Sequence, residues 1–333
     1  MDAIVSAGGI PLPGEPLYPF TNGRPKATLD IAGKPMIQWV LDAISAAKTI
    51  ENVIIVGMTE KSGLTCAKPT YYLSNQGKMV ENMRAGAKKV RELNQQAEHI
   101  LFVSSDIPAI TGEMVDWVVN TAMQTDEDVY YNVIEREVME KRFPGSKRTW
   151  TKLKDIEVCG GDMNVGRLSL ILGEGNDLWD KITDARKSPA KQAALIGLNT
   201  VIPLLFGQLA LKQAEENIMK RLGITGRAVV CPYAEVGMDI DKPNQLEIMR
   251  ADMEKSLKTA RSASARKAAK AAKAASANKA AKAAKTAPAK KAAKAAKTAP
   301  AKKNAKATKT SPVKKATKKA KTAPVKKTTS KKK

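Results

Sequence analysis

Few residues of this chain could support disulfide, zinc or nucleophilic chemistry. Its three cysteines, Cys66, Cys159 and Cys231, are far apart and show no CxxC spacing. This argues against a disulfide scaffold or a zinc site and fits a reducing cytoplasm. The single histidine, His99, precedes an apolar segment, and we assign it a structural role. Because the chain has one histidine, it offers little basis for a Ser/His/Asp or Cys/His catalytic set.

Long apolar runs are also missing. The most apolar segment, residues 195–211, is short for a membrane span and is interrupted by Asn199, Pro203 and Gly207. We expect a buried or half-exposed helical hairpin there, and a patch facing a membrane surface is the alternative. The start of the chain does not read as a signal peptide, because Asp2 stands where a cation is usual and no small-residue cleavage site follows a long apolar run.

Acidic residues are absent from the C-terminal part of the chain. The 333 residues include 57 Lys and Arg against 33 Asp and Glu, which gives a formal net charge of +24. Residues 255–333 have 28 of the basic residues and no acidic ones, so 29 basic and 33 acidic residues remain in 1–254, a net charge of −4. The chain therefore divides into a mildly acidic domain, residues 1–254, and an intensely basic tail, residues 255–333.

The tail is built mainly from Ala, Lys, Thr, Ser and Pro, and it has no aromatic residue. It cannot bury a core, and we expect it to be disordered when free. Within KTAPAKK-like repeats, prolines recur every 12 residues, at Pro288, Pro300, Pro312 and Pro324. The Ala-Lys runs between them favour a helix, which we expect charge repulsion to prevent until an anion neutralises the lysines.

Lysines without aromatic residues predict sequence-independent contacts with phosphates, weakened by salt through counterion release. The composition of the tail resembles the C-terminal tails of linker histones and of lysine-rich bacterial histone-like proteins. Nucleic acid, DNA first, is therefore the expected partner. RNA, polyphosphate, an anionic membrane surface and a merely solubilising tail are the alternatives. The expected location is the cytoplasm, in association with the nucleoid.

Strand-like and helix-like segments alternate in the first part of the domain. The expected strands are 2–6, 53–56, 71–73, 100–103 and 129–134, and the expected helices are 35–47, 77–93 and 111–123. This alternation predicts a doubly wound α/β sheet with mostly parallel strands. Because ligands of such sheets bind at the carboxyl ends of the strands, the loops after Val5, Val56 and Val103 form the candidate site.

The first of these loops reads SAGGIPLPGEPLYPFTNGRPKATLDIAGKPM, from Ser6 to Met36. Glycines let the backbone approach a phosphate closely, and inward-pointing N–H groups bind the anion. Arg24 and Lys26 add positive charge. The alternative is an ordinary strand-to-helix connection that prolines make rigid.

Carboxylates occur at two places that could hold a metal ion. Asp106 comes at the end of the strand 100–103, where Mg²⁺ would bridge to substrate phosphates, unless this residue only caps the next turn. Asp239 and Asp241 alternate along a strand-like segment before a helix that starts at Pro243. The two places could share one metal ion, or two, if the sheet brings them together.

The order of AGG, RPKATLDIAGKPMIQWVLDAI, SSDIPAIT and DIDKPNQLEIMR resembles the nucleotidyltransferase family that contains molybdenum cofactor guanylyltransferases and sugar-phosphate nucleotidyltransferases. The resemblance covers most of residues 1–254 and implies a three-layer, Rossmann-like fold. It implies Mg²⁺-dependent transfer of an NMP from an NTP to a phosphorylated or hydroxyl acceptor, with release of pyrophosphate. Lys26 falls on the lysine that contacts phosphates, Asp106 on a metal-binding aspartate, and Asp239 or Asp241 on the second metal position.

The resemblance also implies a nucleotide site. The segment Ala7, Gly8 and Gly9 would hold the triphosphate, and Asn82, in GKMVENMRAGAKKV, would lie near the base. The family loop usually continues as AGGxGxRMG, whereas this chain has IPLPGEPLYPF and no cation before Arg24. Arg24 would then replace the arginine of the family.

The acceptor side is expected in two later segments. RFPGSKRTWTKL, residues 142–153, has four basic residues: Arg142, Lys147, Arg148 and Lys152. The segment could bind an anionic acceptor, with Arg148 as the contact, or form a solvated hairpin. In CGGDMNVG, Asp162 and Asn164 are candidate polar contacts.

A second function remains open at this point. The altered glycine loop favours a non-catalytic, nucleotidyltransferase-like domain that serves as a DNA-binding, nucleoid-associated protein. The joint presence of Lys26, Asp106 and the Asp239/Asp241 pair favours the enzyme, because neighbouring carboxylates without a function would only cost stability.

Overall fold

The computed structural model describes residues 1–285 except 174–177, 179–180, 182–184 and 186–187. The chain divides into two units, Met1–Ala268 and Ala269–Lys333, and the first contains the α/β sheet. Its main strands are β1 (Asp2–Ser6), β4 (Val53–Val56), β5 (Thr70–Leu73), β6 (His99–Ser104), β7 (Val129–Glu135), β8 (Thr151–Lys152), β9 (Glu157–Gly160), β10 (Met163–Arg167) and β11 (Gly226–Val230). A small hairpin adds β2 (Asp30–Ile31) and β3 (Lys34–Pro35).

Among the described residues, nine strands form one sheet in the order β5-β4-β1-β6-β10-β7-β9-β8, and β11 also pairs with β7. The strands β5, β4, β1 and β6 are parallel. β10 runs antiparallel to both β6 and β7 and joins the parallel half to the rest of the sheet. The carboxyl ends of β1, β4 and β6 therefore lie side by side, as the alternation of strands and helices predicted.

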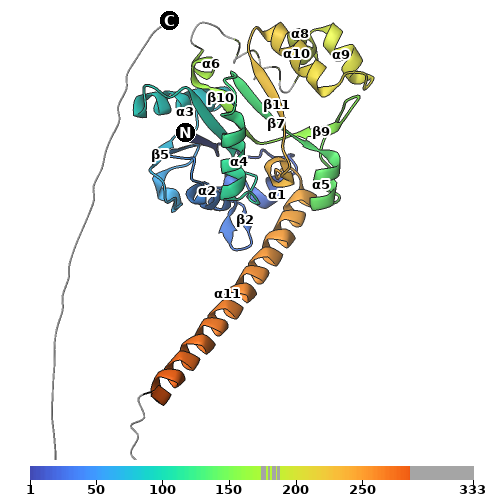
Figure 1. Cartoon of the computed structure of the whole chain (residues 1–333). Coiled ribbons are helices and arrows are strands. Elements are labelled where there is room, and N and C mark those ends of the chain that lie inside the picture. Colours follow the sequence, from blue (N-terminus) through green and yellow to red (C-terminus); the bar gives the residue numbers. More distant parts are fainter. Residues whose placement is uncertain (174–177, 179–180, 182–184, 186–187, 286–333) are drawn as a thin grey trace, which may run out of the picture. The chain divides into compact units, whose positions relative to one another are not determined.

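Helices cover both faces of the sheet, which gives three layers (Figure 1). They are α1 (Tyr18–Thr21), α2 (Met36–Ala46), α3 (Met79–Leu93), α4 (Gly112–Ala122), α5 (Arg136–Arg142), α6 (Leu168–Leu172), α8 (Pro189–Ile196), α9 (Leu198–Leu205), α10 (Leu211–Leu222) and α11 (Pro243–Lys285). Short 3₁₀ turns are η1 (Lys26–Thr28), η2 (Glu60–Ser62) and η3 (Ala234–Gly237).

Alternate residues of the central strands face opposite layers. Val5 of β1 belongs to the core that includes α2 and α4, whereas Ile4 packs with Met83 of α3 and Ile171 of α6. Strands buried on both faces read as continuous apolar runs, which is why β4 and β6 were recognisable from their sequences. Thr111 caps α4, because its side chain accepts a hydrogen bond from the Met114 N–H.

The segment 195–211 is helical, as expected. It includes the end of α8 and all of α9, which Gly197 separates at a φ of +86°. Leu205 and Phe206 are 78% and 73% exposed, so this segment is half-exposed rather than buried. No helix among the described residues combines the length and the apolar character needed to cross a bilayer.

Two expectations need correction. The segment around Asp239 and Asp241 is not a strand: it follows η3, and the Asp241 and Lys242 N–H groups donate to Gln245 Oε1 at 2.9 and 2.8 Å, so it forms the cap of α11. The tail was expected to be disordered from residue 255, but α11 continues to Lys285. The helix propensity of Ala and Lys outweighs the charge repulsion over this stretch, and residues 286–333 lie outside the described residues.

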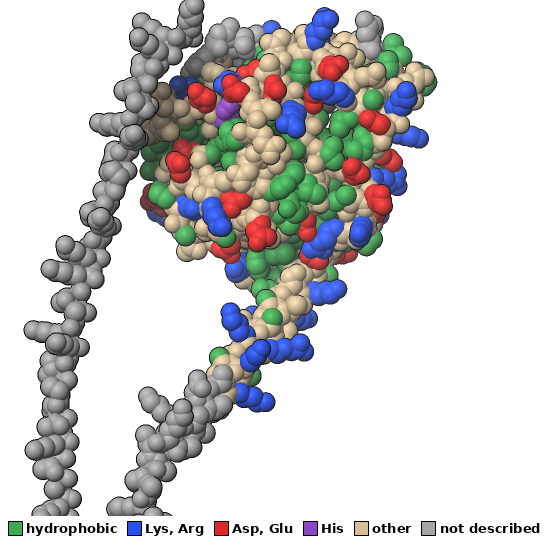
Figure 2. Space-filling view, in the orientation of Figure 1, with side chains coloured by type: hydrophobic (Ala, Val, Ile, Leu, Met, Phe, Trp, Pro, Cys, Tyr) green, Lys and Arg blue, Asp and Glu red, His purple; other side chains and the backbone are tan. Residues whose placement is uncertain are grey.

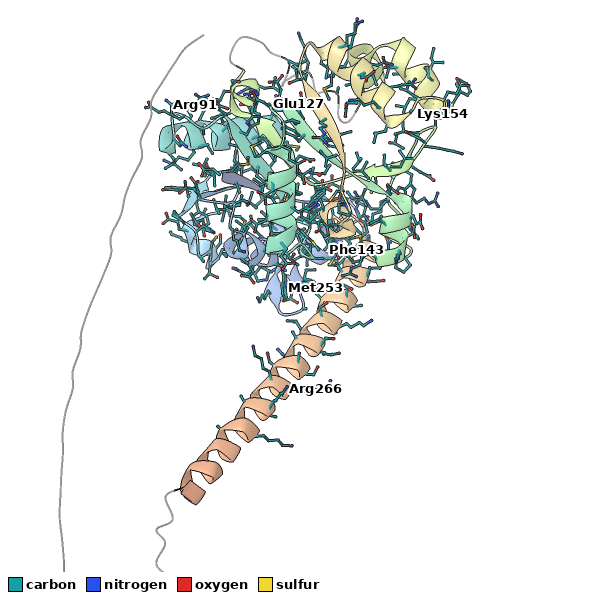
Figure 3. All side chains as sticks on the ribbon, in the orientation of Figure 1. Arg91, Glu127, Phe143, Lys154, Met253 and Arg266 are labelled. Carbon is teal, nitrogen blue, oxygen red and sulfur yellow. The ribbon has the colours of Figure 1, made fainter. Side chains whose placement is uncertain are left out.

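The first unit accordingly extends to Ala268 instead of ending at residue 254. Met249 and Met253 of α11 are buried in the main core, which also includes Phe143 (Figure 3). From residue 255 to residue 273, side chains of α11 are mostly exposed, and lysines and arginines recur along it (Figure 2).

Candidate active site

Lys26 is held at the carboxyl ends of the central strands. Its backbone N–H donates to Gly9 O at 2.8 Å, which closes the neck of the loop formed by residues 10–25. Its Nζ lies 2.6 Å from Asp106 Oδ2 and 2.6 Å from Asp241 Oδ1. Burial alone would lower the pKa of Lys26, but the two carboxylates outweigh burial and raise the pKa above its ordinary value. The ammonium group is therefore a permanent positive charge at this position.

Asp106 follows β6, as the sequence predicted. Its backbone carbonyl accepts a hydrogen bond from the Ile240 N–H at 3.1 Å, and this bond fixes the segment with Asp239 and Asp241 at the end of β6. The residue is 7% exposed, and its Oδ1 atom is buried with no hydrogen-bond partner among the described residues. A buried carboxylate oxygen without a partner is costly, and here it faces a cluster of other charges.

The three predicted metal-binding carboxylates meet. Oxygen atoms of Asp106, Asp239 and Asp241 all lie within 4.8 Å of one another. The α11 cap brings both Asp239 and Asp241 to Asp106, so both remain candidates for the second metal position. Burial raises the pKa of the Asp241 carboxyl, but Lys26 lies against it and holds the pKa below its ordinary value.

The donor set fits a hard divalent cation. Mg²⁺ is bound by carboxylate oxygens, usually one or two, with the rest of its coordination from water and substrate phosphates. The cluster offers three carboxylates, and the Oδ1 of Asp106 accepts no hydrogen bond from any residue that the structure describes. These residues can hold the Mg²⁺ ion that the sequence predicted.

A second cationic side chain, Arg148, lies at the carboxylate cluster. Arg148 Nη1 forms an ion pair with Asp239 Oδ1, and Arg148 Nη2 lies 3.9 Å from Asp162 Oδ2. The structure thus places two of the predicted acceptor residues, Arg148 and Asp162, beside the metal-binding carboxylates. The pairing of Arg148 with Asp239 was not predicted, because the sequence carries no signal for a contact between these segments.

The other basic residues of the segment 142–153 lie elsewhere. Arg142 donates to Glu235 and, through two nitrogens, to Asp252, so it ties α5 to η3 and α11. Lys147 and Lys152 are exposed. The segment is neither a solvated hairpin nor a single basic patch, since two of its arginines are used inside the fold.

Asn164 lies in β10, where the sheet uses its side chain. Its Oδ1 accepts from the Asn132 N–H at 2.7 Å, and its Nδ2 donates to Gly161 O at 2.8 Å. In this structure Asn164 joins neighbouring strands, and its contact with an acceptor stays a prediction.

Asn82, which the resemblance places near the base, lies beside the glycine segment. A Cβ atom added to Gly8 would come within 3.0 Å of the side chains of both Asn75 and Asn82. The Oδ1 of Asn82 accepts from the Gln76 N–H at 2.7 Å, and its Nδ2 donates to Asn75 Oδ1 at 3.1 Å. Asn82 thus supports the turn that borders the glycines, and its role toward a base stays a prediction.

The glycine segment approaches a neighbouring loop very closely. A Cβ atom added to Gly57, which follows β4 at a φ of +103°, would lie 2.3 Å from Gly8 Cα. Ala7 continues the sheet, because its N–H donates to Val56 O at 2.8 Å. The sheet therefore uses the Ala7 N–H, whereas the N–H groups of Gly8 and Gly9, also predicted to bind the triphosphate, come after the strand.

Residues 10–25, which we call the proline loop, use their backbone N–H groups for hydrogen bonds within the loop. Five of its residues are prolines and have no N–H, the Leu12 N–H donates to Glu15 Oε2, and the Tyr18 N–H donates to Glu15 O. Arg24 is exposed, and its Nε donates to Thr21 O at 3.2 Å, within the loop. Residues 10–25 therefore do not form the ring of inward N–H groups that a glycine-rich phosphate loop has.

Gln245 is a site residue that sequence reasoning missed. It is 1% exposed, and its Oε1 accepts the N–H groups of Asp241 and Lys242. The signal was present, since Pro243 at the first position of a helix and Gln245 two residues later match one half of a capping box.

Comparison with known proteins agrees with this geometry. Residues 21–276 match the model of the MobA-like NTP transferase domain. A hypothetical transferase from Thermus thermophilus is 31% identical, with a TM-score of 0.63 over 74% of this chain and 98% of that chain. No curated protein sequence gives a significant match.

More distant solved structures also match. CMP:2-keto-3-deoxy-manno-octonic acid synthetase, complexed with CTP, is 15% identical, with a TM-score of 0.46 over 77% of this chain and 98% of that chain. 4-Diphosphocytidyl-2C-methyl-D-erythritol synthase from Anaerococcus prevotii is 12% identical, with a TM-score of 0.45 over 76% of this chain and 95% of that chain. Neither is similar enough for its substrate to be assigned to this chain.

Proposed function

Because the chain belongs to the family of MobA-like NTP transferase domains and is a nucleotidyltransferase, we propose that it is Mg²⁺-dependent and transfers a nucleoside monophosphate to a phosphorylated or hydroxyl acceptor. The observation that supports this best is the meeting of Lys26 with Asp106 and Asp241, at 2.6 Å each, beside Asp239. An acceptor oxygen attacks the α-phosphorus of the NTP, the bond from that phosphorus to the bridging oxygen breaks, and pyrophosphate leaves with the electron pair.

Asp106, Asp239 and Asp241 would hold the metal ion. When bound, Mg²⁺ neutralises phosphate charge and orients the phosphates for in-line displacement. The carboxylates are fixed for this by the main-chain bond between Ile240 and Asp106 and by the Gln245 cap. The buried Asp106 Oδ1, which has no partner among the described residues, supports this assignment.

Lys26 supplies a fixed positive charge for the phosphate oxygens. Its raised pKa keeps it protonated at neutral pH, so it stabilises developing negative charge and does not act as a base. The backbone bond from Lys26 to Gly9 places this charge next to the Gly8 and Gly9 amides. These amides, with Ala7 preceding them, would bind the triphosphate.

Other predicted contacts complete the proposal. Arg24 would reach the triphosphate from the rim of the proline loop, and Asn82 would border the base. Arg148 and Asp162, which lie next to the metal-binding carboxylates, would face the acceptor. Asn164, which joins neighbouring strands of the sheet, would be a further polar contact for the acceptor.

A ligand-stability experiment tests the nucleotide and metal together. The midpoint of thermal unfolding of the full chain is measured with ATP, GTP, CTP or UTP, with and without Mg²⁺. Ligand at about 100 times its Kd adds about 2.7 kcal/mol to the free energy of unfolding. We expect one nucleotide to raise the midpoint only with Mg²⁺, and Asp106→Asn to abolish that rise.

Asp42→Asn is the matched control, because Asp42 is a surface aspartate that pairs with Lys34 outside the site. It should respond to the nucleotide as the wild type does. If no nucleotide changes the midpoint, the proposed Mg²⁺-dependent nucleotide site at this cluster is refuted.

We also propose that the tail, residues 255–333, tethers the enzyme to nucleic acid, and that the protein is cytoplasmic and nucleoid-associated. Its support is the row of exposed lysines and arginines on α11 from Lys255 to Lys273 (Figure 2) together with the tail composition. Binding of a DNA duplex by the full chain should weaken steeply with salt, whatever the duplex sequence. A chain shortened to residues 1–268 should lose most of this binding, and equal binding would refute the tether.

A further inference from the structure

We propose that Arg148 is a displaceable counter-ion of the metal site. In this interpretation its guanidinium neutralises Asp239 while no metal ion is bound, and it leaves Asp239 when a divalent cation enters. This inference rests on the proposed function, because it presumes that the three carboxylates bind a metal. It adds a role for Arg148 in controlling how tightly the metal is held.

The carboxylates of the cluster are divided between two cations. Lys26 contacts Asp106 and Asp241, and Arg148 contacts Asp239. The side chains of Arg148 and Asp239 are each only 12% exposed, so water screens this pair weakly. Three negative charges thus face two positive ones, and each carboxylate already has a cationic partner.

A divalent cation cannot simply join this arrangement. Bound among oxygens that lie within 4.8 Å of one another, it would stand a few ångströms from the guanidinium. Two positive charges at such a short separation repel each other, and the burial of the pair leaves this repulsion weakly screened. Metal and guanidinium therefore compete for Asp239.

Arg148 is more readily displaced than Lys26. The Lys26 ammonium bridges two carboxylates, whereas Arg148 has one close carboxylate, and Asp162 lies at the longer distance of 3.9 Å. The Arg148 Nε atom is buried and has no hydrogen-bond partner among the described residues. A guanidinium that has one close carboxylate and an unsatisfied nitrogen loses less on leaving than an ammonium that bridges two carboxylates does.

The backbone that carries Arg148 is anchored, so the movement belongs to the side chain. Lys242 Nζ donates to Lys147 O at 2.9 Å, and Asn244 Nδ2 donates to Gly145 O at 3.2 Å. A guanidinium that leaves Asp239 needs another anion nearby, because an unpaired buried cation is costly. An anionic group of a substrate would supply it, so metal and substrate would favour each other's binding.

Metal affinity is the direct test. The full chain is titrated with Mn²⁺ alone, and free Mn²⁺ is read by electron paramagnetic resonance. Arg148→Gln removes the competing charge and should tighten Mn²⁺ binding by at least about tenfold. Arg148→Lys keeps the charge and should stay within about threefold of the wild type, a difference under 1 kcal/mol.

A purely structural role of Arg148 predicts no tightening of Mn²⁺ binding in the Arg148→Gln variant. If Arg148 only holds Asp239 in place, Arg148→Gln would weaken Mn²⁺ binding or leave it unchanged, and the inference would be wrong. Arg136→Gln is the control for total charge, because Arg136 pairs with Glu157 at the surface and should leave the affinity unaltered.

Asp106→Asn separates this inference from the proposed function. If it weakens Mn²⁺ binding while Arg148→Gln does not tighten it, the metal site stands and only the role of Arg148 is refuted. If Asp106→Asn has no effect, the metal is not held at this cluster, and both proposals fail.

Discussion

Lys26 and Asp241 are separated by 215 positions in the chain, and the Lys26 Nζ lies 2.6 Å from Asp241 Oδ1. The lysine belongs to the connection after β1, and the aspartate belongs to the cap of α11. Their contact joins the first and last parts of the α/β unit at the end of β6. Folding of the whole unit is therefore needed to assemble the charged centre of the site.

Replacing Lys26 should abolish most of the activity. Lys26→Met removes the fixed charge that we assign to the phosphate oxygens, and we expect kcat/KM for pyrophosphate release to fall by at least about 10²-fold. Lys34→Met is the control, since Lys34 forms an exposed ion pair with Asp42 and should retain activity. Similar rates for the two variants would remove Lys26 from the mechanism.

Gly57→Ala should disturb the glycine segment. Its new Cβ would lie 2.3 Å from Gly8 Cα, and the φ of +103° is unfavourable for alanine. We expect the free energy of unfolding to fall by at least about 2 kcal/mol and the KM for the nucleotide to rise. Gly63→Ala has the same kind of backbone strain, at +68°, but no atom within 4 Å of its Cβ. Gly63→Ala should lower the free energy of unfolding less than Gly57→Ala does, and it should leave the KM for the nucleotide unchanged. If both variants change the two quantities equally, backbone strain alone explains the effect of Gly57→Ala.

Arg142→Met should lower stability without removing a substrate contact. The arginine donates to Glu235 at 2.7 Å and to both oxygens of Asp252 at 2.7 and 2.8 Å. Its side chain is 37% exposed, so we expect a loss of only about 1–2 kcal/mol in urea unfolding. The surface pair of Arg136 with Glu157 offers the comparison, and Arg136→Met should cost less than about 1 kcal/mol. A larger cost for Arg136→Met would contradict this assignment.

Asp116 should make stability depend on pH. Its Oδ1 accepts from the Lys48 and Thr49 N–H groups and from Thr49 Oγ1, at 2.7–2.8 Å. Burial raises the pKa of Asp116, but these hydrogen bonds outweigh burial and hold the pKa below its ordinary value of 3.8. Its stabilising contribution is therefore complete above that value and is lost as the pH falls through the lower, folded-state pKa.

Urea unfolding of Asp116→Asn and of the wild type tests this prediction. At pH 7 the variant should be less stable by about 1 kcal/mol, and the difference should shrink in strong acid. A difference that stays constant between pH 7 and pH 3 would show that the carboxylate charge contributes nothing at this position.

The sequence predicted those strands and helices whose apolar residues follow one regular spacing. Val53–Val56 and the run before Asp106 are apolar because both faces of these strands are covered, and Thr111 is a helix cap by its residue type. Asp106, Asp239 and Asp241 were singled out as possible metal ligands from their positions, and the family resemblance assigned a phosphate contact to Lys26. The structure brings these four residues together, and their roles stay predictions. Local pattern and family motif were thus sufficient for this part of the site.

Contacts between distant irregular segments were not predictable. The segment of Asp239 and Asp241 was expected to be strand-like, but it packs at the end of β6 without pairing as a strand, and Met238, Asp239 and Ile240 are all buried. The ion pair of Arg148 with Asp239 joins two loops, and a periodic pattern of apolar residues does not predict the path of a loop. The helical start of the tail was missed because charge repulsion was given more weight than the helix propensity of alanine and lysine.

The hydrogen bond from the Lys26 N–H to Gly9 O has a consequence for how this enzyme can diverge. A main-chain bond does not depend on the side chains beside it, so residues 10–25 can change in composition and length while the lysine keeps its place. Loop insertions cost little free energy once the ends of the loop are fixed. Substrate preference can therefore evolve, or be engineered by exchanging this loop as a cassette, without rebuilding the charged centre.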